Sequence, residues 1–298
     1  MNNFQIKNEL RSDTKVNDLK RIAAIHDLSG YGKCSLTIAL PVISAAGIEC
    51  SCLPTAVLST HTGGFKGYTI RDLTCDMYNI AKHWSTLGIH FDAIYSGYLC
   101  NSHQAGILEE IVNLLKDEKT MVIIDPVMGD NGKYYSNLGE EICNSFKKLC
   151  SYADIVIPNF TEASFLLNEE YKKPPYTQEY VEGMLKKLSN LGPSKIVLTG
   201  VSFNDNEIGA ACYDSKTNKV HYALSKKIDI SCHGTGDLFA SALSALVVRG
   251  MDIDEALEIA IDFVHESIYR TYIRQTPPIN GVDFEGALPQ FIKRIQEI

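Results

Sequence analysis

A glycine-rich turn that leads directly into an apolar helix is the segment of this chain best suited to chemistry. Gly234, Thr235 and Gly236 precede Asp237, and small apolar residues follow it. Backbone N–H groups at a helix N-terminus, reached through glycines that carry no side chain, form a cradle for an anion. A helix cap would explain Asp237 alone, but not the whole combination. An ionised carboxylate beside a bound phosphate can accept a proton from an attacking hydroxyl, so the pattern predicts phosphoryl transfer with Asp237 as the base.

Further acidic and hydroxyl side chains follow other apolar runs. Asp125 ends an entirely apolar run, and Asp130 follows in a turn rich in Gly and Asn, where a turn-forming role would also explain it. Two carboxylates at one strand end suit Mg²⁺, which prefers one or two carboxylates together with waters and phosphate oxygens. Glu162 follows Asn159 at a helix start, where capping explains it as well as a place in a cleft does. Thr199 adds a hydroxyl suited to a nucleotide phosphate.

Two loops carry side chains that suit a small polar ring. His61 and Thr62 lie in the glycine-rich segment 59–68, which could hydrogen-bond such a ring and cover it, although its composition also fits a plain surface loop. Tyr98 follows another apolar run and could stack on a planar ligand. A lone aromatic side chain is more commonly part of the core, so both interpretations of Tyr98 stay open.

The segment 26–35, HDLSGYGKCS, matches known phosphate-binding loops only in part. A P-loop needs Ser or Thr where Cys34 stands, and a dinucleotide fingerprint needs Gly or Ala where Ser35 stands. Glu49 lies at a suitable distance along the chain for a ribose-binding acid. A dinucleotide-binding oxidoreductase is therefore one alternative, and a tight turn that needs glycine dihedrals is another.

The elements that must position these side chains alternate along the chain. Amphipathic helical patterns separate short apolar runs that we interpret as β-strands, near residues 21–26, 48–54, 91–97, 120–126, 153–159 and 194–200. A hairpin over 207–224 and two helices near 235–249 and 253–273 follow. Continuous apolar strands between helices indicate an α/β fold, a three-layer αβα sandwich with a mostly parallel central sheet. Such a sheet binds ligands at the carboxyl ends of its strands, where the polar residues above lie.

Composition limits the class of protein. The 298 residues carry a net charge of −8 without a run of four Lys or Arg, so we expect neither nucleic-acid nor membrane binding. We expect a polar arm over 1–20, which lacks the apolar core of a signal peptide, and a single domain over 21–298. Nine scattered cysteines, of which only Cys50 and Cys52 are close in sequence, favour reduced thiols in a cytoplasmic protein.

Seven motifs follow one another between residues 21 and 275, namely SGYG, LSTHTGG, SGYL, DPVMGD, PNFTEASFLL, IVLTG and GTGDLF. With these motifs in this order, the chain resembles the ribokinase-like superfamily of carbohydrate and vitamin kinases. DPVMGD, PN-x-x-E and GTGD are typical of the superfamily, and STHTG with SGY is similar to its pyridoxal kinase branch.

The resemblance implies a homodimeric αβα kinase that uses MgATP to phosphorylate the 5′-hydroxymethyl group of vitamin B6, with K⁺ required in many members. On the matching positions, Asp237 would be the catalytic base and would face the substrate, and Gly234, Thr235 and Gly236 would form the anion hole. The resemblance also assigns Asp125, Asn159, Glu162 and Thr199 to the binding of MgATP. It assigns Asp130 and Glu162 to the metal, and Asp27, His61, Thr62 and Tyr98 to the vitamin.

Departures from the pyridoxal kinase pattern leave the substrate open. Many pyridoxal kinases carry Ser where Asp27 stands and Asn where Leu36 stands, and the charge of Asp27 bears on which vitamer is preferred. The segment SCHGTGD, with Cys232 and His233 directly before the glycines, resembles the corresponding segment of bacterial relatives that also act on hydroxymethylpyrimidine. A hydroxymethylpyrimidine kinase or another small-alcohol kinase is the alternative within the class, and a non-catalytic vitamin B6 carrier is an alternative outside it.

Overall fold

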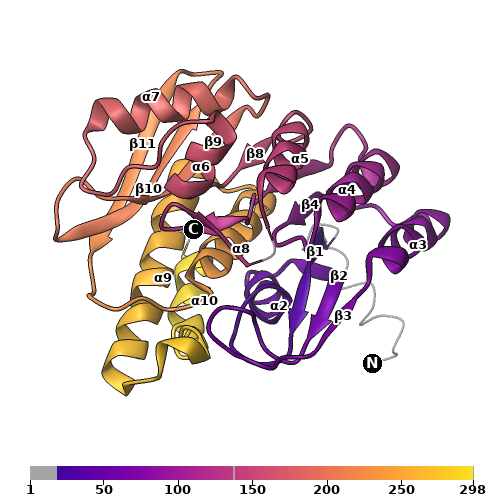
Figure 1. The fold of residues 1–298 in the computed structure, drawn as a ribbon, viewed down its shortest axis with the longest axis horizontal. Coiled ribbons are helices and arrows are strands. Elements are labelled where there is room, and N and C mark those ends of the chain that lie inside the picture. Colours follow the sequence, from indigo (N-terminus) through magenta and orange to yellow (C-terminus); the bar gives the residue numbers. More distant parts are fainter. Residues whose placement is uncertain (1–18, 137, 298) are drawn as a thin grey trace, which may run out of the picture.

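A nine-stranded sheet forms the centre of the molecule (Figure 1). The computed structural model describes residues 19–136 and 138–297, so the predicted polar arm over 1–20 lies almost wholly outside the described residues. In spatial order the strands are β11 (Lys219–Lys226), β10 (Glu207–Asp214), β9 (Lys195–Val201), β8 (Ile155–Val156), β5 (Met121–Ile124), β4 (Ala93–Ser96), β1 (Arg21–Ser29), β2 (Glu49–Leu58) and β3 (Ile70–Asp72).

Parallel pairing dominates this sheet. The pairs β1–β2, β1–β4, β4–β5, β5–β8 and β8–β9 are parallel, whereas β3 and β10 run antiparallel to their neighbours. The chain places β2 on one side of β1 and then β4 on the other side. This reversal creates a topological switch point between β1 and β4, where parallel sheets commonly bind ligands.

Helices cover both faces of the sheet and give the predicted three layers. One face carries α2 (Leu36–Ala45), α8 (Thr235–Arg249), α9 (Ile253–Arg274) and α10 (Leu288–Gln296). The other carries α3 (Thr74–Thr86), α4 (Ser102–Leu115), α5 (Glu140–Cys150), α6 (Phe160–Leu167) and α7 (Gln178–Ser189). Within β1, Ile22 packs into the first core and Ile25 into the second, because successive side chains of a strand point to opposite faces.

The structure confirms the predicted fold class and differs from the sequence interpretation at several boundaries. β1 extends to Ser29, so Asp27 belongs to the strand itself and not to the turn after it. The short strand β3, the hairpin of β6 (Gly129–Asp130) and β7 (Lys133–Tyr134), and the helix α10 were not predicted. Strands of two or three residues leave too short a pattern to detect. Among the described residues, no helix is long and apolar enough to cross a membrane.

Candidate active site

The predicted site residues all lie toward the carboxyl ends of the parallel strands, or at the start of α8. They are Asp27 near the end of β1, His61 and Thr62 after β2, Tyr98 after β4, Asp125 and Asp130 after β5, Asn159 and Glu162 after β8, Thr199 on β9, and Gly234 to Asp237. A bridge between Asn159 and Thr199 joins two of these strand ends directly. The parallel topology therefore gathers residues that lie more than a hundred positions apart in the chain.

The N-terminus of α8 has the open geometry that an anion hole needs. Gly234 is the N-cap residue, with φ of 81°, and it provides no side-chain cap to the first N–H groups of the helix. A Cβ atom at Gly234 would lie 2.2 Å from the carbonyl oxygen of Lys33, so only glycine fits. A Cβ at Gly236 would meet no other atom within 4 Å. The uncapped N–H groups and the helix dipole together favour an anion at this helix end.

Asp237 combines a recessed position with a pKa suited to proton transfer. Its side chain is only partly exposed, and burial raises its pKa to about 7, against the effect of a hydrogen bond from the main-chain N–H of Ser35. The nearby charge of Asp27 raises the pKa further. A general base works best when its pKa lies near the operating pH, so a carboxyl with this pKa has the property that proton transfer near neutrality requires.

Ser35 hydrogen-bonds Asp27 and lies near Asp237. Its hydroxyl donates to Oδ1 of Asp27 at 2.5 Å, and Ser29 donates to Oδ2 of the same carboxylate at 2.8 Å. Burial raises the pKa of Asp27, and these hydrogen bonds oppose that effect. The sequence interpretation missed Ser35, because it considered this position only as one where a dinucleotide fingerprint lacks its glycine. The feature of the sequence that could have identified Ser35 is its hydroxyl group in the loop after the first strand.

A second group of acids lies after β5 and β8. Glu162 and Asn159 form a capping box at the start of α6, in which Oε2 of Glu162 accepts the N–H of Asn159 at 2.9 Å. The other oxygen, Oε1, accepts the N–H of Met128 at 3.1 Å. Burial raises the pKa of Glu162 to about 8. Glu162 is therefore a helix cap and a buried acid of the cleft at once, so the two interpretations of the sequence are compatible.

Asp125 is buried beside this capping box. Burial raises its pKa well above the usual range, and the charges of Glu162 and Asp237 add to that effect. Asp130 lies instead on the exposed tip of the β6–β7 hairpin, where its carboxylate accepts two hydrogen bonds from Asn131, each at 2.8 Å. The structure thus gives Asp130 a turn-forming role and places Asp125 among the buried acids.

His61 anchors the loop between β2 and β3. Its Nε2 donates to the carbonyl of Ile279 at 2.8 Å, and its Nδ1 accepts the N–H of Gly63 at 3.1 Å. The ring lies 4.6 Å from that of His233, between ring centroids. Both ring nitrogens are therefore used within the protein, whereas the neighbouring Thr62 stays partly exposed. Tyr98 is mostly buried, and burial raises its pKa.

A family model described as "Phosphomethylpyrimidine kinase" matches residues 40–278, which include the anion hole and all but one of the acids above. The chain belongs to the phosphomethylpyrimidine kinase family. This membership confirms the predicted ribokinase-like kinase, because relatives and structural neighbours that are named pyridoxal kinases match the same chain.

Three relatives illustrate the range of the family. A Bacteroides thetaiotaomicron protein described as a "putative phosphomethylpyrimidine kinase", crystallised with pyridoxal, is 34% identical with a TM-score of 0.87, covering 92% of this chain and 96% of its own. The pyridoxal kinase from Lactobacillus plantarum is 26% identical with a TM-score of 0.85, covering 94% and 99%. The hydroxymethylpyrimidine/phosphomethylpyrimidine kinase of Bacillus subtilis is 29% identical, covering 73% and 77%.

Membership in a kinase family excludes the dinucleotide-binding oxidoreductase, and so does the position of Glu49, its proposed ribose-binding acid. Glu49 begins β2 and pairs with Arg21 at the start of β1, at 2.8 Å. It therefore lies at the opposite end of the parallel strands from the glycine-rich loop after β1. A ribose acid must lie at the carboxyl end of its strand, so this alternative is wrong.

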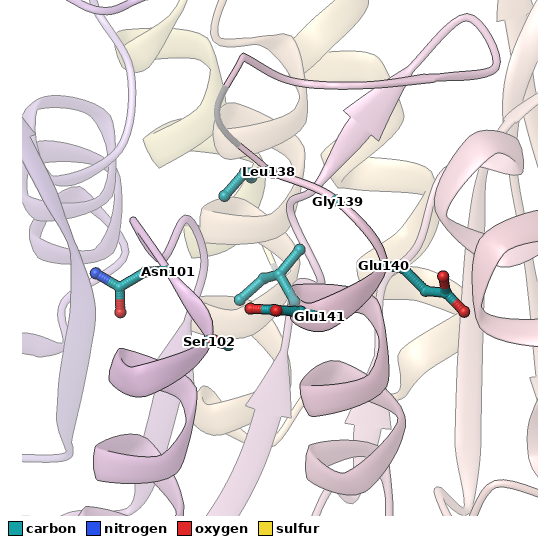
Figure 2. A pocket seen from close by; sticks show the side chains of 7 residues that line it. Asn101, Ser102, Leu138, Gly139, Glu140 and Glu141 are labelled. Carbon is teal, nitrogen blue, oxygen red and sulfur yellow. The ribbon is translucent and has the colours of Figure 1, made fainter.

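A cavity of about 360 Å³ lies between the starts of α4 and α5 (Figure 2). Its lining comes from Asn101 and Ser102 on one side and from the segment 138–142 on the other. It contains none of the predicted site residues. The candidate site is therefore defined by the anion hole and the buried acids, not by this cavity.

Proposed function

We propose that the chain is a vitamin B6 kinase that transfers the γ-phosphoryl group of ATP to the 5′-hydroxymethyl group of pyridoxal, pyridoxine or pyridoxamine. The observation that carries this proposal is Asp237, a carboxylate with a pKa of about 7 in the first turn of an uncapped helix. A base beside an anion cradle is what transfer of a phosphoryl group to an alcohol requires.

Asp237 takes the hydroxyl proton as the substrate oxygen attacks the γ-phosphorus. The bond to the leaving ADP oxygen breaks as the new P–O bond forms, and the N–H groups from Gly234 to Gly236 stabilise the charge on the equatorial oxygens. Little negative charge builds up on the nucleophile before that bond breaks, so a base of modest strength is sufficient. Asn159 and Thr199, which meet at adjacent strand ends, lie toward the nucleotide in this proposal.

The buried acids fit a magnesium nucleotide. Asp125 and Glu162 carry pKa values raised by burial, and a bound cation would relieve their mutual repulsion. Among the described residues, no group of three or more His, Cys, Asp or Glu could hold a metal ion alone. Mg²⁺ typically uses one or two carboxylates and completes its shell with phosphate oxygens and waters, so Glu162 with Asp125 fits better than the exposed Asp130. When bound, Mg²⁺ supplies charge neutralisation on the phosphates.

The vitamin would lie at the carboxyl ends of β1, β2 and β4, where Asp27, Thr62 and Tyr98 are found. Asp27 offers a carboxylate to a ring nitrogen or hydroxyl, and the Bacteroides relative crystallised with pyridoxal supports a B6 vitamer as the acceptor. His61 then acts by holding its loop. The resemblance also supports a cytoplasmic homodimer, and K⁺ as a further activator.

A hydroxymethylpyrimidine kinase is the second candidate, favoured by the family model and by the Bacillus subtilis relative. One assay separates the two candidates. The protein and its Asp237→Asn variant are incubated with MgATP and, in turn, pyridoxal, pyridoxine, pyridoxamine and hydroxymethylpyrimidine, and the phosphorylated products are measured. If all three B6 vitamers are inert at high enzyme concentration, the B6 assignment fails. If Asp237→Asn keeps nearly full turnover, the assignment of the base fails.

A further inference from the structure

The anion hole rests on two segments outside its own motif. The loop 30–35 meets it at Gly234, whose missing side chain admits the carbonyl of Lys33. The segment 276–285 meets it at His233, which donates its N–H to Pro278 at 3.4 Å and accepts the N–H of Val282 at 3.2 Å. These contacts run from backbone to backbone. The position of the first N–H groups of α8 is therefore fixed by how the two segments lie against each other.

The loop 30–35 holds a backbone conformation that its residues disfavour. Lys33 and Ser35 have φ of 53° and 51°, in the left-handed region that residues with a side chain rarely adopt. Such strain persists only where the surroundings enforce it, and it is concentrated at functional sites. Here the conformation brings the carbonyl of Lys33 close to Gly234.

The side chain of Lys33 ties this strained loop to the C-terminal segment. Its Nζ donates to Oδ1 of Asp283 at 2.8 Å and to Oε2 of Glu285 at 3.0 Å. The Asp283 side chain is only 8% exposed and also accepts the hydroxyl of Thr276 at 2.6 Å. The main-chain N–H of Asp283 donates to Thr271 of α9 at 2.8 Å. Asp283 is thus a fixed anchor, and Lys33 is the cation that reaches it from the loop.

We propose that Lys33, through its ion pair with Asp283, is a positioning residue for the anion hole. The pair holds the left-handed loop against Gly234, so that the N–H groups of α8 and the carboxylate of Asp237 keep the arrangement that phosphoryl transfer needs. Lys33 acts through the backbone and does not contact the substrate. The inference rests on the proposed phosphoryl-transfer function.

The variants Lys33→Gly and Asp283→Asn test this role. Each removes the ion pair, and we expect kcat to fall about 10- to 100-fold while KM for ATP changes less than about twofold, because small misplacements of catalytic groups mainly lower turnover. Glycine also relieves the left-handed strain at position 33, so the melting temperature of Lys33→Gly should stay near that of the wild type. The double variant should lose no more turnover than Asp283→Asn alone.

The matched control is Glu49→Gln. It removes the Arg21–Glu49 pair, which has the same 2.8 Å separation but lies at the other end of β1, and its kcat should stay within about twofold of the wild type. A Lys33→Gly variant with wild-type kcat overturns the proposal. So does a Lys33→Gly variant whose turnover falls only together with its melting temperature, because a general loss of stability would then explain the lower activity.

A binding measurement tests the inference independently of the acceptor alcohol. MgADP with aluminium fluoride, a mimic of the transferring phosphoryl group, should raise the melting temperature of the wild type beyond the effect of MgADP alone. Lys33→Gly should lose this extra increase and keep the increase due to MgADP. An equal extra increase in both proteins overturns the inference. If the wild type phosphorylates none of the alcohols, the proposed function fails, and this measurement still decides whether Lys33 positions the anion hole.

Discussion

The two ends of the parallel strands treat acidic side chains in opposite ways. At the amino ends, Glu49 pairs with Arg21, and this hydrogen bond lowers the pKa of Glu49. Asp214 pairs with Lys195, which lowers the pKa of Asp214 despite its partial burial. At the carboxyl ends, burial raises the pKa values of Asp27, Asp125, Glu162 and Asp237. Carboxylates are thus paired with Arg or Lys at the amino edge of the sheet, whereas at the carboxyl edge they lie close to other carboxylates.

This difference separates stability from function within one sheet. A paired surface carboxylate adds a little stability and does nothing else. Buried carboxylates that face one another destabilise the free protein, and that cost falls when a cation or a proton arrives. In the proposed function, the carboxyl edge binds a metal nucleotide and transfers a proton, whereas the paired acids of the amino edge contribute only to stability.

The largest expected effect concerns Asp237. We expect Asp237→Asn to lower kcat by about 10²- to 10⁴-fold, since the amide cannot accept the proton of the alcohol. Its unfolding free energy should be equal to or higher than that of the wild type, because a buried charge is removed. Steady-state kinetics and urea unfolding measure both quantities. An Asp237→Asn enzyme with more than about a tenth of wild-type kcat would contradict the division between the two edges.

The next effect concerns Asp125 and its counterpart Asp214 at the other edge. Asp125→Asn should weaken binding of MgADP by about tenfold or more, while raising the melting temperature of the free protein, because a buried repulsive charge is lost. Asp214→Asn should do the reverse, lowering the melting temperature without changing MgADP affinity. Calorimetric titration and thermal unfolding of the two variants provide the measurements. Equal effects of the two variants on affinity would show that the edges are not specialised.

Stability should depend on pH through the carboxyl edge. The pKa of Asp237 rises from 3.8 to about 7 on folding, so its contribution to stability is fully present below pH 4 and is lost as the pH rises through 7. Glu49 and Asp214 behave oppositely, since their lowered pKa values give stability that is lost only as the pH falls below about 4.

Between pH 5 and 8, Asp237→Asn should therefore unfold with a flatter pH dependence than the wild type. We expect a difference of about 1–3 kcal/mol across this range, less than the full shift implies because the side chain keeps some contact with water. Urea unfolding at several pH values, without nucleotide, measures it. Parallel curves for the two proteins would mean that Asp237 has an ordinary pKa in the folded state.

The smallest effect concerns Glu49. Glu49→Gln should lower the unfolding free energy by at most about 1 kcal/mol, because both partners of this pair remain partly exposed. High salt should remove most of the difference, since it screens exposed charges. Denaturant unfolding at low and high salt is the measurement. A larger loss that persists in salt would show that the amino edge is more than a weakly paired surface.

Much of the fold was predictable because its signals are local. The apolar runs fixed the parallel strands, and the helix predicted near 235–249 is observed as Thr235–Arg249. The capping box of Asn159 and Glu162 was visible as a three-residue spacing. Helix α10 was missed although Phe291 and Ile295 lie one turn apart and are both buried, so its helical pattern was present in the sequence.

The sequence alone determined which residue types end each strand, and with them the chemistry of phosphoryl transfer, because motifs such as GTGD depend on local backbone geometry. Only the tertiary structure decided how those residues are connected. It brought Ser35 to the carboxylate of Asp27, used both nitrogens of His61 to hold a loop, and paired Lys33 with Asp283, 250 positions away. Such contacts depend on packing between segments distant in the chain, and neither periodicity nor spacing along a sequence records them.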